Sequence, residues 1–325
     1  FFNAESPEHI VFTLNATHAL NIAIKSIMHQ GGHAVVSGYE HNSVIRPLEA
    51  MKCENVRYTV AHGELFDADS AYNAVIDSLE SDTRCIIINH VSNVFGFVQP
   101  LEKIDKLCCE KQIPLIIDAS QSAGVIKIDV SALKSVAFVC MPGHKALYGP
   151  QGTGVLICCK DEELYSIMQG GTGSNSLMLT QPDFLPDIFE SGTLNTHGIA
   201  GLCEGVKFVT EQGLENIQEH EKVLLADMAE ILGNINGVKV YYSTANHIGP
   251  ISFTWDRIGN EELCDELSEN GFCLRSGLHC SPMAHKSAGT LPCGTIRASF
   301  GMFNDRNQVK TFGKIVNNLL SSKTV

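Results

Sequence analysis

The sequence predicts an α/β protein with a large, mainly parallel β-sheet in one domain and a smaller α+β domain at the carboxyl end. Between residues 8 and 120, short apolar runs alternate with amphipathic stretches, which is typical of βαβ units. Farther along, a long helical stretch leads into a second group of strands and helices. With 325 residues, 44% of them hydrophobic, the chain suffices for one large or two medium domains. We place the boundary so that residues 1–205 form the large domain and residues 206–325 the small one.

Each strand of the large domain is predicted at an apolar run. These runs are Ile10–Leu14, Ala34–Ser37, Val56–Val60, Cys85–His90, Pro114–Asp118, Val136–Cys140 and Gly154–Cys158. The amphipathic stretches between them predict helices at Thr17–His29, Asp67–Leu79 and Leu101–Lys111. The second of these helices begins with an Asp and the third follows a Pro, and both residues favour helix starts.

The rest of the chain predicts a different arrangement. The run Gly170–Ser174, followed by Pro182 and Pro186, breaks the periodicity and predicts an ordered loop region. Beyond this loop the expected helices are Ile199–Ile235, Glu261–Asn270 and Gln308–Ser321, and the expected strands are Val238–Tyr242, Ile251–Trp255 and Thr295–Phe300.

The composition limits the classes of partner. The formal charge of −13 and the lack of any Lys/Arg-rich run argue against nucleic acid and anionic membranes, so a small-molecule ligand is expected. No apolar stretch approaches the roughly 18 residues that cross a bilayer, and a signal-peptide pattern is lacking, so we expect a cytoplasmic location. The first residue is not Met, and we expect an N-terminal segment to be missing. The twelve cysteines are expected to be mostly reduced core thiols.

An acid and a lysine mark the predicted site. Asp118 ends an apolar strand at the edge where open α/β sheets bind ligands, and a buried carboxylate needs a partner. A protonated pyridinium nitrogen is one suitable partner, while a turn cap or an Arg pair is the ordinary alternative. Lys145 follows another buried strand and precedes a glycine-rich turn, where a desolvated amine can form a Schiff base. The G-x-x-G-x-G spacing there does not match a dinucleotide-binding fingerprint.

Several motifs along the chain together carry a family resemblance. They are Asn15-Ala16-Thr17-His18-Ala19-Leu20-Asn21, Glu40-His41-Asn42, His90-Val91-Ser92-Asn93, Asp118-Ala119-Ser120-Gln121, Gly143-His144-Lys145, Ser191-Gly192-Thr193-Leu194-Asn195-Thr196 and Arg275-Ser276-Gly277-Leu278-His279-Cys280. In this order they resemble the class V aminotransferase family, specifically the cysteine desulfurases and selenocysteine lyases with the longer cysteine loop. Any one motif alone is weak evidence, but together they span nearly the whole chain.

The resemblance implies a PLP-dependent transferase of fold type I, aspartate-aminotransferase-like. Lys145 would carry pyridoxal 5'-phosphate (PLP), and Asp118 would pair with the pyridinium nitrogen. Gln121 would hydrogen-bond the phenolic oxygen of the ring, with Asn93 nearby. His41 would stack on the ring face and assist proton transfer, although any single histidine is more often structural.

The resemblance also implies a phosphate site at Ala16 and Thr17. They open the first predicted helix, where backbone N–H groups and the helix dipole favour an anion, although an isolated Thr there is more often an N-cap. His144 would add a contact, and Thr193 would reach the phosphate of a partner subunit. A homodimer with shared active sites follows. The role of His90 stays open.

Cys280 is the expected nucleophile. It lies on a polar loop after a short apolar strand, and Arg275 and His279 could favour its thiolate. The other cysteines are expected to be small buried hydrophobes. A competing interpretation makes His279, Cys280, His285 and Cys293 zinc ligands, although their spacing matches no usual zinc motif.

Arg297 lies inside a predicted strand, and the resemblance implies that it clamps the carboxylate of the substrate, with Asn93 and Arg275 also in the substrate site. A structural salt bridge is the alternative for Arg297. The implied function is desulfuration of cysteine to alanine through a persulfide on the enzyme, with a possible sulfur-acceptor protein. Selenocysteine lysis, or a PLP-binding sulfur-relay protein with little activity of its own, are the alternatives. Two departures from the family pattern are Pro142, where relatives often have Ser or Thr, and the missing N-terminal segment, which in relatives holds part of the substrate site.

Overall fold

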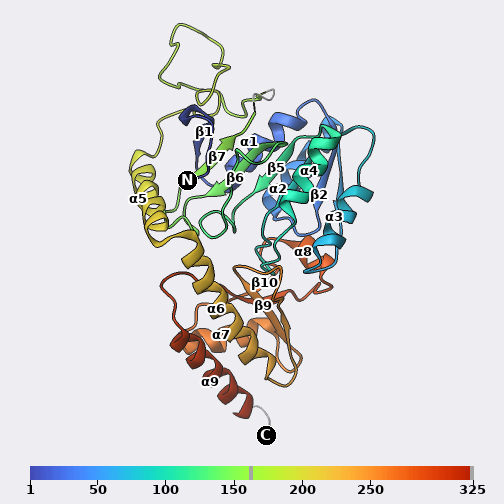
Figure 1. Cartoon of the computed structure of the whole chain (residues 1–325), viewed down its shortest axis with the longest axis vertical. Coiled ribbons are helices and arrows are strands. Elements are labelled where there is room, and N and C mark those ends of the chain that lie inside the picture. The colour runs from blue at the N-terminus through green and yellow to red at the C-terminus, as the bar shows by residue number, and fades with distance from the viewer. Residues whose placement is uncertain (161–163, 323–325) are drawn as a thin grey trace.

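The computed structural model describes residues 1–160 and 164–322. Within these ranges the chain forms a seven-stranded sheet and a four-stranded sheet. Figure 1 shows the larger sheet with helices on both sides and the smaller sheet below it, beside α6, α7 and α9. The α/β class, with a large and a small sheet region, is confirmed. The predicted boundary at residue 205 lies inside α5 and stays a prediction.

The large sheet is mainly parallel, in the order β1-β7-β6-β5-β4-β2-β3. Its strands are β1 (Ile10–Thr13), β2 (Gly32–Ser37), β3 (Val56–Ala61), β4 (Thr83–Asn89), β5 (Leu115–Asp118), β6 (Val136–Pro142) and β7 (Gly154–Cys158). In this sheet β7 runs antiparallel to both of its neighbours, and the other pairings are parallel. All seven strands lie at the apolar runs of the sequence.

The central strands are apolar along their length because both faces of the sheet are covered. Every residue of β5, β6 and β7 is buried, as expected of strands with helices on both sides. One face of the large sheet packs against α1 (Ala16–Met28) and α2 (Asn42–Ala50), with Leu20 and Ile24 in the core. The opposite face packs against α3 (Ala68–Asp77) and α4 (Leu101–Lys111), with Ile104 and Leu107 in the core.

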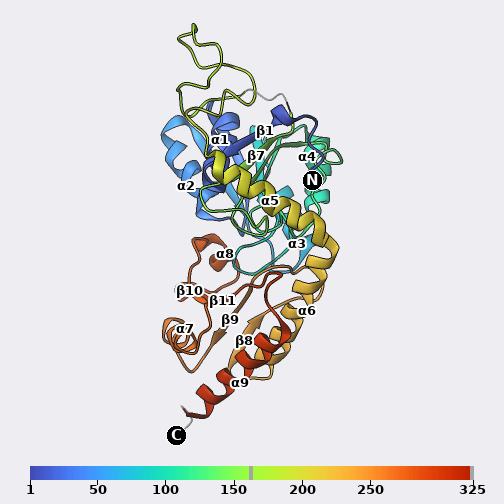
Figure 2. The same ribbon diagram turned by 90° about the vertical axis from the view of Figure 1, so that its left-hand side faces the viewer.

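The predicted single helix Ile199–Ile235 is wrong. The structure has two helices, α5 (Thr196–Gln212) and α6 (Leu214–Gly233), separated at Gly213. Gly213 has a φ of 81°, a backbone conformation that favours glycine and interrupts a right-handed helix. Figure 2 shows α5 lying along the large sheet region and α6 continuing beside the small sheet.

The small sheet has the order β10-β11-β9-β8 and is antiparallel throughout. Its strands are β8 (Val238–Tyr241), β9 (Ile251–Trp255), β10 (Arg275–Gly277) and β11 (Thr295–Ala298). Its helices are α7 (Asn260–Glu269), α8 (Pro282–Ser287) and α9 (Arg306–Ser322). Leu225, Phe253 and Phe312 belong to its separate hydrophobic core, to which α6 contributes.

Some elements were missed or misplaced by the sequence. The helices α2 and α8 and the 3₁₀ turns Pro7–His9 and Met51–Glu54 were not expected. Pro47 inside α2 obscured the helical pattern there. The strand near the cysteine motif is not an apolar segment before it but the first residues of the motif itself, Arg275–Gly277, paired with β11.

The region between residues 164 and 195 has no helix or strand, as the glycines and prolines predicted. Figures 1 and 2 show it extending away from the large sheet. None of the helices in the described ranges combines the length and the apolar character needed to cross a membrane.

The prediction that the cysteines other than Cys280 are buried is only partly correct. All are unpaired thiols. The core interpretation holds for Cys85, Cys108, Cys140, Cys158 and Cys264, but it is wrong for Cys53, Cys109, Cys203, Cys273 and Cys293, which are exposed.

Candidate active site

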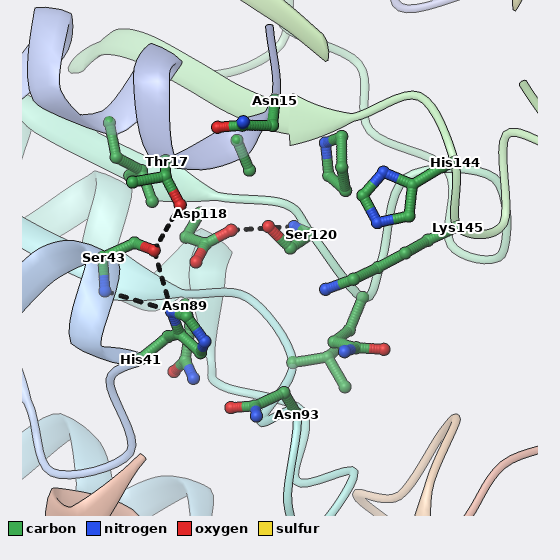
Figure 3. Close-up of a pocket in the computed structure, with 15 residues that line it drawn as sticks. Asn15, Thr17, His41, Ser43, Asn89, Asn93, Asp118, Ser120, His144 and Lys145 are labelled. Atoms are coloured by element: carbon green, nitrogen blue, oxygen red, sulfur yellow. Dashed lines mark hydrogen bonds between the residues drawn. The ribbon is translucent and has the colours of Figure 1, made fainter. Parts of the chain in front are cut away.

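A pocket opens where β4, β5 and β6 end. Asn89 ends β4, Asp118 ends β5, and Pro142 at the end of β6 leads directly into His144 and Lys145. Parallel strands bring their carboxyl ends to one edge, so residues far apart in the sequence meet there. Figure 3 shows Asn89, Asp118, His144 and Lys145 around the pocket. Eight predicted cofactor residues line it: Ala16, Thr17, His41, Asn93, Asp118, Gln121, His144 and Lys145.

Asp118 has two kinds of contact. Its side chain is 4% exposed. One carboxylate oxygen, Oδ1, accepts a hydrogen bond from the backbone N–H of Ser120 at 2.9 Å. Asp118 thus caps a local turn, as the ordinary interpretation proposed, but its carboxylate also lines the pocket. No ion pair with an arginine involves Asp118 in the described part of the chain.

Lys145 points its amine into the pocket. Much of its side chain is exposed, but Figure 3 shows the amine directed toward the space beside Asp118. Burial lowers the pKa of this amine, the Asp118 carboxylate opposes the shift, and Arg297 adds to it. Burial, with a smaller effect of Lys145, also lowers the pKa of the neighbouring His144. A lysine with a lowered pKa is more often the neutral amine that attacks a carbonyl carbon.

The N-terminus of α1 forms another wall of the pocket. Asn15 is the N-cap, and its side chain accepts a hydrogen bond from the backbone N–H of His18 at 3.0 Å. Thr17 is therefore not the cap, contrary to the ordinary interpretation. The first N–H groups of a helix have no partner within it, and the helix dipole places partial positive charge there. Because Ala16 and Thr17 line the pocket, this end of α1 suits an anion.

His41 is held by a short hydrogen-bonded chain. Its Nδ1 accepts from the backbone N–H of Ser43 at 3.0 Å and lies 2.9 Å from the Ser43 hydroxyl. That hydroxyl lies 2.7 Å from the hydroxyl of Thr17 (Figure 3). Since Nδ1 accepts a backbone N–H, the neutral ring carries its proton on Nε2. Burial lowers the pKa of His41, the charge of Asp118 opposes this shift, and Lys145 adds to it.

Seven residues that line the pocket were not predicted as individual site residues: Asn15, Leu20, Ser43, Asn89, Val91, Ser120 and Pro142. Ser43, Asn89 and Ser120 line the pocket beside the predicted residues. Ser43 holds His41, and the backbone of Ser120 holds Asp118. Asn89 and Ser120 could have been found because they stand at the ends of predicted strands. Ser43 carries no such signal, since it lies in a helix that the sequence did not indicate.

A fully buried acid, Glu40, lies behind the pocket residue Asn89. Glu40 is 0% exposed, and its Oε1 accepts hydrogen bonds from the Ser37 hydroxyl and the Asn89 backbone N–H, both at 2.6 Å. In the described part of the chain its Oε2 has no hydrogen-bond partner. Burial raises the pKa of Glu40 to about 8, and the negative charge of Asp118 adds to the shift.

Cys280 lies in a groove that adjoins the pocket. Thr17, His41 and Ser43 line both the pocket and the groove, and Cys280 and Arg46 line the groove. The cysteine is exposed, as expected. Cys280 therefore lines a groove that adjoins the pocket of Lys145, although the two residues belong to separate sheet regions of the molecule.

The two predicted substrate arginines lie side by side on the small sheet. Arg275 in β10 and Arg297 in β11 are register partners. Burial lowers the pKa of Arg297, with a further effect of Arg275. Its Nη1 donates to the backbone oxygen of Asn93 at 2.7 Å, and no ion pair in the described ranges involves it. A structural salt bridge therefore does not account for Arg297.

The expected help of His279 to the Cys280 thiolate is wrong. His279 is buried, its Nε2 donates to the backbone oxygen of Thr295 at 3.0 Å, and burial lowers its pKa to about 3. The ring is neutral at ordinary pH and supplies no positive charge. The zinc interpretation finds no support either, since no group of three or more His, Cys, Asp or Glu in the described residues is placed to hold a metal ion.

Neither His90, whose role the sequence left open, nor the predicted cofactor residue Thr193 lines the pocket. His90 does not line it; burial lowers its pKa to about 4, and its backbone N–H donates to the Asp118 backbone oxygen at 3.0 Å. His90 thus supports the strand ends. Thr193 lines a different groove, together with Phe12, Thr153 and Glu190.

Comparison with known proteins agrees with this fold. The family model of the class V aminotransferases matches residues 1–312. A probable cysteine desulfurase of Methanothermobacter thermautotrophicus is 31% identical over 97% of this chain and 80% of the relative. One from Pyrococcus abyssi is 30% identical over 99% of this chain and 81% of the relative. The chain therefore belongs to the class V aminotransferase family.

Solved structures support the same architecture. The apo structure of a cysteine desulfurase from Thermococcus onnurineus NA1 matches with a TM-score of 0.87 at 27% identity, covering 97% of this chain and 80% of the other. The cysteine desulfurase CsdA from Escherichia coli matches with a TM-score of 0.89, covering 98% of this chain and 81% of the other; at 22% identity this shows the fold alone. The predicted fold type I architecture is thereby confirmed.

Proposed function

We propose that this chain is a PLP-dependent cysteine desulfurase that converts L-cysteine to L-alanine and takes the sulfur onto Cys280. One observation carries the proposal. The Lys145 amine and the Asp118 carboxylate line one pocket, and the exposed Cys280 lines the groove next to it. The relatives named as cysteine desulfurases match this chain over nearly its whole length.

The donor set of the pocket fits PLP. Lys145 would hold the aldehyde carbon, Asp118 the ring nitrogen and Gln121 the phenolic oxygen. The α1 N-terminus at Ala16 and Thr17, with His144, would hold the phosphate. When bound, PLP supplies an electron sink for the pair released at the substrate carbon, and a carboxylate at its ring nitrogen keeps that sink protonated.

The chain's own residues would orient the substrate. The guanidinium of Arg297 suits the substrate carboxylate because its planar fork donates two parallel hydrogen bonds. Asn93 and Arg275 lie beside it. His41 would cover the ring face, and its Nε2–H would exchange protons with the substrate or leaving groups.

Cys280 would perform the sulfur transfer. Its thiolate attacks the substrate sulfur, an S–S bond forms and the substrate C–S bond breaks. The bonding pair stays with the substrate carbon, which then takes a proton and leaves as alanine. The persulfide remains on Cys280 for a thiol acceptor, and a sulfur-acceptor protein is the proposed recipient. A cytoplasmic location stays a prediction.

We also propose a homodimer with shared sites. Thr193 lies outside the pocket of its own chain, and the same extended region presents Leu177, which is 99% exposed, and Leu179. Exposed apolar side chains grouped on one segment suit a subunit contact. Mixing inactive Lys145→Ala and Thr193→Ala chains should restore activity, since one site of each heterodimer carries neither change. No recovery after verified subunit exchange would contradict sharing.

The decisive experiment is mass spectrometry after brief exposure to cysteine without reductant. We expect a persulfide mapped to Cys280 and one alanine per sulfur removed. A persulfide found only on another exposed thiol, such as Cys53 or Cys203, would show that Cys280 is not the nucleophile. Turnover of cysteine and selenocysteine by the same preparation distinguishes desulfuration from selenocysteine lysis.

A further inference from the structure

The loop that carries Cys280 has an unusual backbone. His279 and Cys280 have φ angles of 50° and 58°, so two consecutive residues other than glycine adopt the left-handed conformation. Residues with a Cβ atom avoid this conformation, and it persists only where neighbouring contacts impose it. Contacts around this loop must therefore hold Cys280 in place.

Asn93 provides two of these contacts. Its Nδ2 donates to the backbone oxygen of His279 at 2.9 Å, and its Oδ1 accepts from the hydroxyl of Ser281 at 2.7 Å. The Asn93 amide thus binds the residues on both sides of Cys280. Ser281 is 0% exposed and Asn93 is 8% exposed, so water does not readily replace either partner.

Two other hydrogen bonds also hold the Cys280 loop. The backbone N–H of Asn42, at the start of α2, donates to the Cys280 backbone oxygen at 2.8 Å. The His279 ring donates to the Thr295 backbone oxygen at 3.0 Å. Among these, the Asn93–Ser281 hydrogen bond joins two side chains, so a single substitution can remove it without altering the backbone.

We propose that the Asn93–Ser281 pair is a latch that positions the Cys280 thiol over the cofactor pocket, and that Ser281 is a positioning residue for sulfur transfer. The proposal rests on the proposed function for its chemistry but not for its geometry. Ser281 touches neither the pocket nor the groove, and it acts through Asn93 and the loop.

The latch also fixes the orientation of the Asn93 amide. A backbone oxygen can only accept and Oδ1 can only accept, so Nδ2 must face His279 and Oδ1 must face the Ser281 hydroxyl. One N–H of Nδ2 is left for the pocket, where a substrate carboxylate would need a donor. Without the Ser281 hydroxyl, only the hydrogen bond from Nδ2 to the His279 backbone oxygen opposes rotation of the amide.

The test variant is Ser281→Ala. Hydrogen exchange of the peptide that contains residues 278–281, followed by mass spectrometry without PLP or substrate, should be faster by about fivefold, as expected for one lost hydrogen bond. In the loaded protein, kcat for cysteine should fall about tenfold or more because the thiol is misplaced. The PLP dissociation constant should stay within about twofold of the wild-type value.

Ser287→Ala is the matched control. The Ser287 hydroxyl donates to the Gly38 backbone oxygen at 2.7 Å, so it also ties the α8 region to the large sheet region, but it does not contact Asn93. If loosening of α8 alone explained the effect, both variants would behave alike. We expect only Ser281→Ala to change exchange in the loop and to lower kcat.

The outcomes separate this proposal from the proposed function. Unchanged loop exchange in Ser281→Ala overturns the latch, whatever the activity. Faster exchange with unchanged kcat overturns the positioning role. If the wild-type protein forms no persulfide from cysteine, the proposed function fails, while the exchange measurement still decides whether the latch exists.

Discussion

The cofactor pocket and the Cys280 loop are positioned in different ways. Asn89, Asp118 and Lys145 stand at or just after the ends of β4, β5 and β6, where the hydrogen bonds between these strands hold the backbone and a buried core supports the sheet on both faces. The Cys280 loop lies between β10 and α8, at the edge of the small sheet, and depends on individual hydrogen bonds to Asn93, Asn42 and Thr295. A change in the pocket should therefore affect chemistry while leaving the backbone in place, whereas a change around the loop should affect where the thiol lies.

The largest effect is expected for Lys145→Ala. The pocket frame should persist, so the protein should fold, but without the amine the covalent yellow colour is lost and turnover falls by roughly 10⁴-fold or more. Borohydride reduction and peptide mapping of the wild-type protein check the attachment site. A label on another lysine would contradict the assignment.

The second largest effect is expected for Cys280→Ser, which should impair the function of the loop while leaving that of the pocket intact. The visible colour and its change on adding cysteine should remain, because the thiol lies outside the pocket. Sulfur release should fall by about 10³-fold because a hydroxyl cannot accept the sulfur. Absorbance and sulfide release are measured on one sample, and Cys273→Ser, which changes an exposed cysteine outside both hollows, serves as control.

A smaller effect is expected for Asp118→Asn. The change keeps the shape and the acceptor for the Ser120 N–H, so folding should change little. Turnover should fall by about 10²-fold or more, because the ring nitrogen loses the carboxylate that keeps it protonated. Steady-state kinetics and thermal unfolding are compared, and near-native turnover would refute the role of Asp118.

The smallest effect concerns the buried acid behind the pocket. The pKa of Glu40 is about 8 in the folded chain, against an ordinary value of 4.5. Between these values the unfolded chain releases the proton and the folded chain keeps it, so this contribution to stability is complete below pH 4.5 and is lost as pH rises to about 8. Glu40→Gln should remove this decrease in stability with rising pH, because glutamine does not ionise.

The measurement for Glu40→Gln is the free energy of unfolding at pH 5 and at pH 8.5, beside the wild type. The difference between variant and wild type should shift in favour of the variant by on the order of 3 kcal/mol between these pH values. Glu219→Gln, on the exposed side of α6, should show no such shift. A pH-independent difference for Glu40→Gln would mean that Glu40 ionises in the folded chain as it does in the unfolded one.

Much of the large sheet and of the pocket at its edge could be predicted from the sequence. The strands of the large sheet were readable because central strands covered on both faces must be apolar throughout. Asp118 and Lys145 were readable because polar residues directly after such strands reach the ligand edge. The break at Gly213 was missed because the apolar periodicity continues on both sides of it, and only the positive φ of that glycine separates α5 from α6.

The sequence by itself determined the fold class, the strand ends that frame the pocket and the candidate acid, lysine and cysteine, because periodicity and residue type are local properties. Only the tertiary structure decided which groups act together. It showed that His279 is buried and neutral, that Ser43 fixes the proton of His41 on Nε2, and that Asn93 accepts a hydrogen bond from Ser281, the residue after Cys280. These facts depend on burial and on contacts between residues as far apart as 93 and 281, and a linear sequence contains neither.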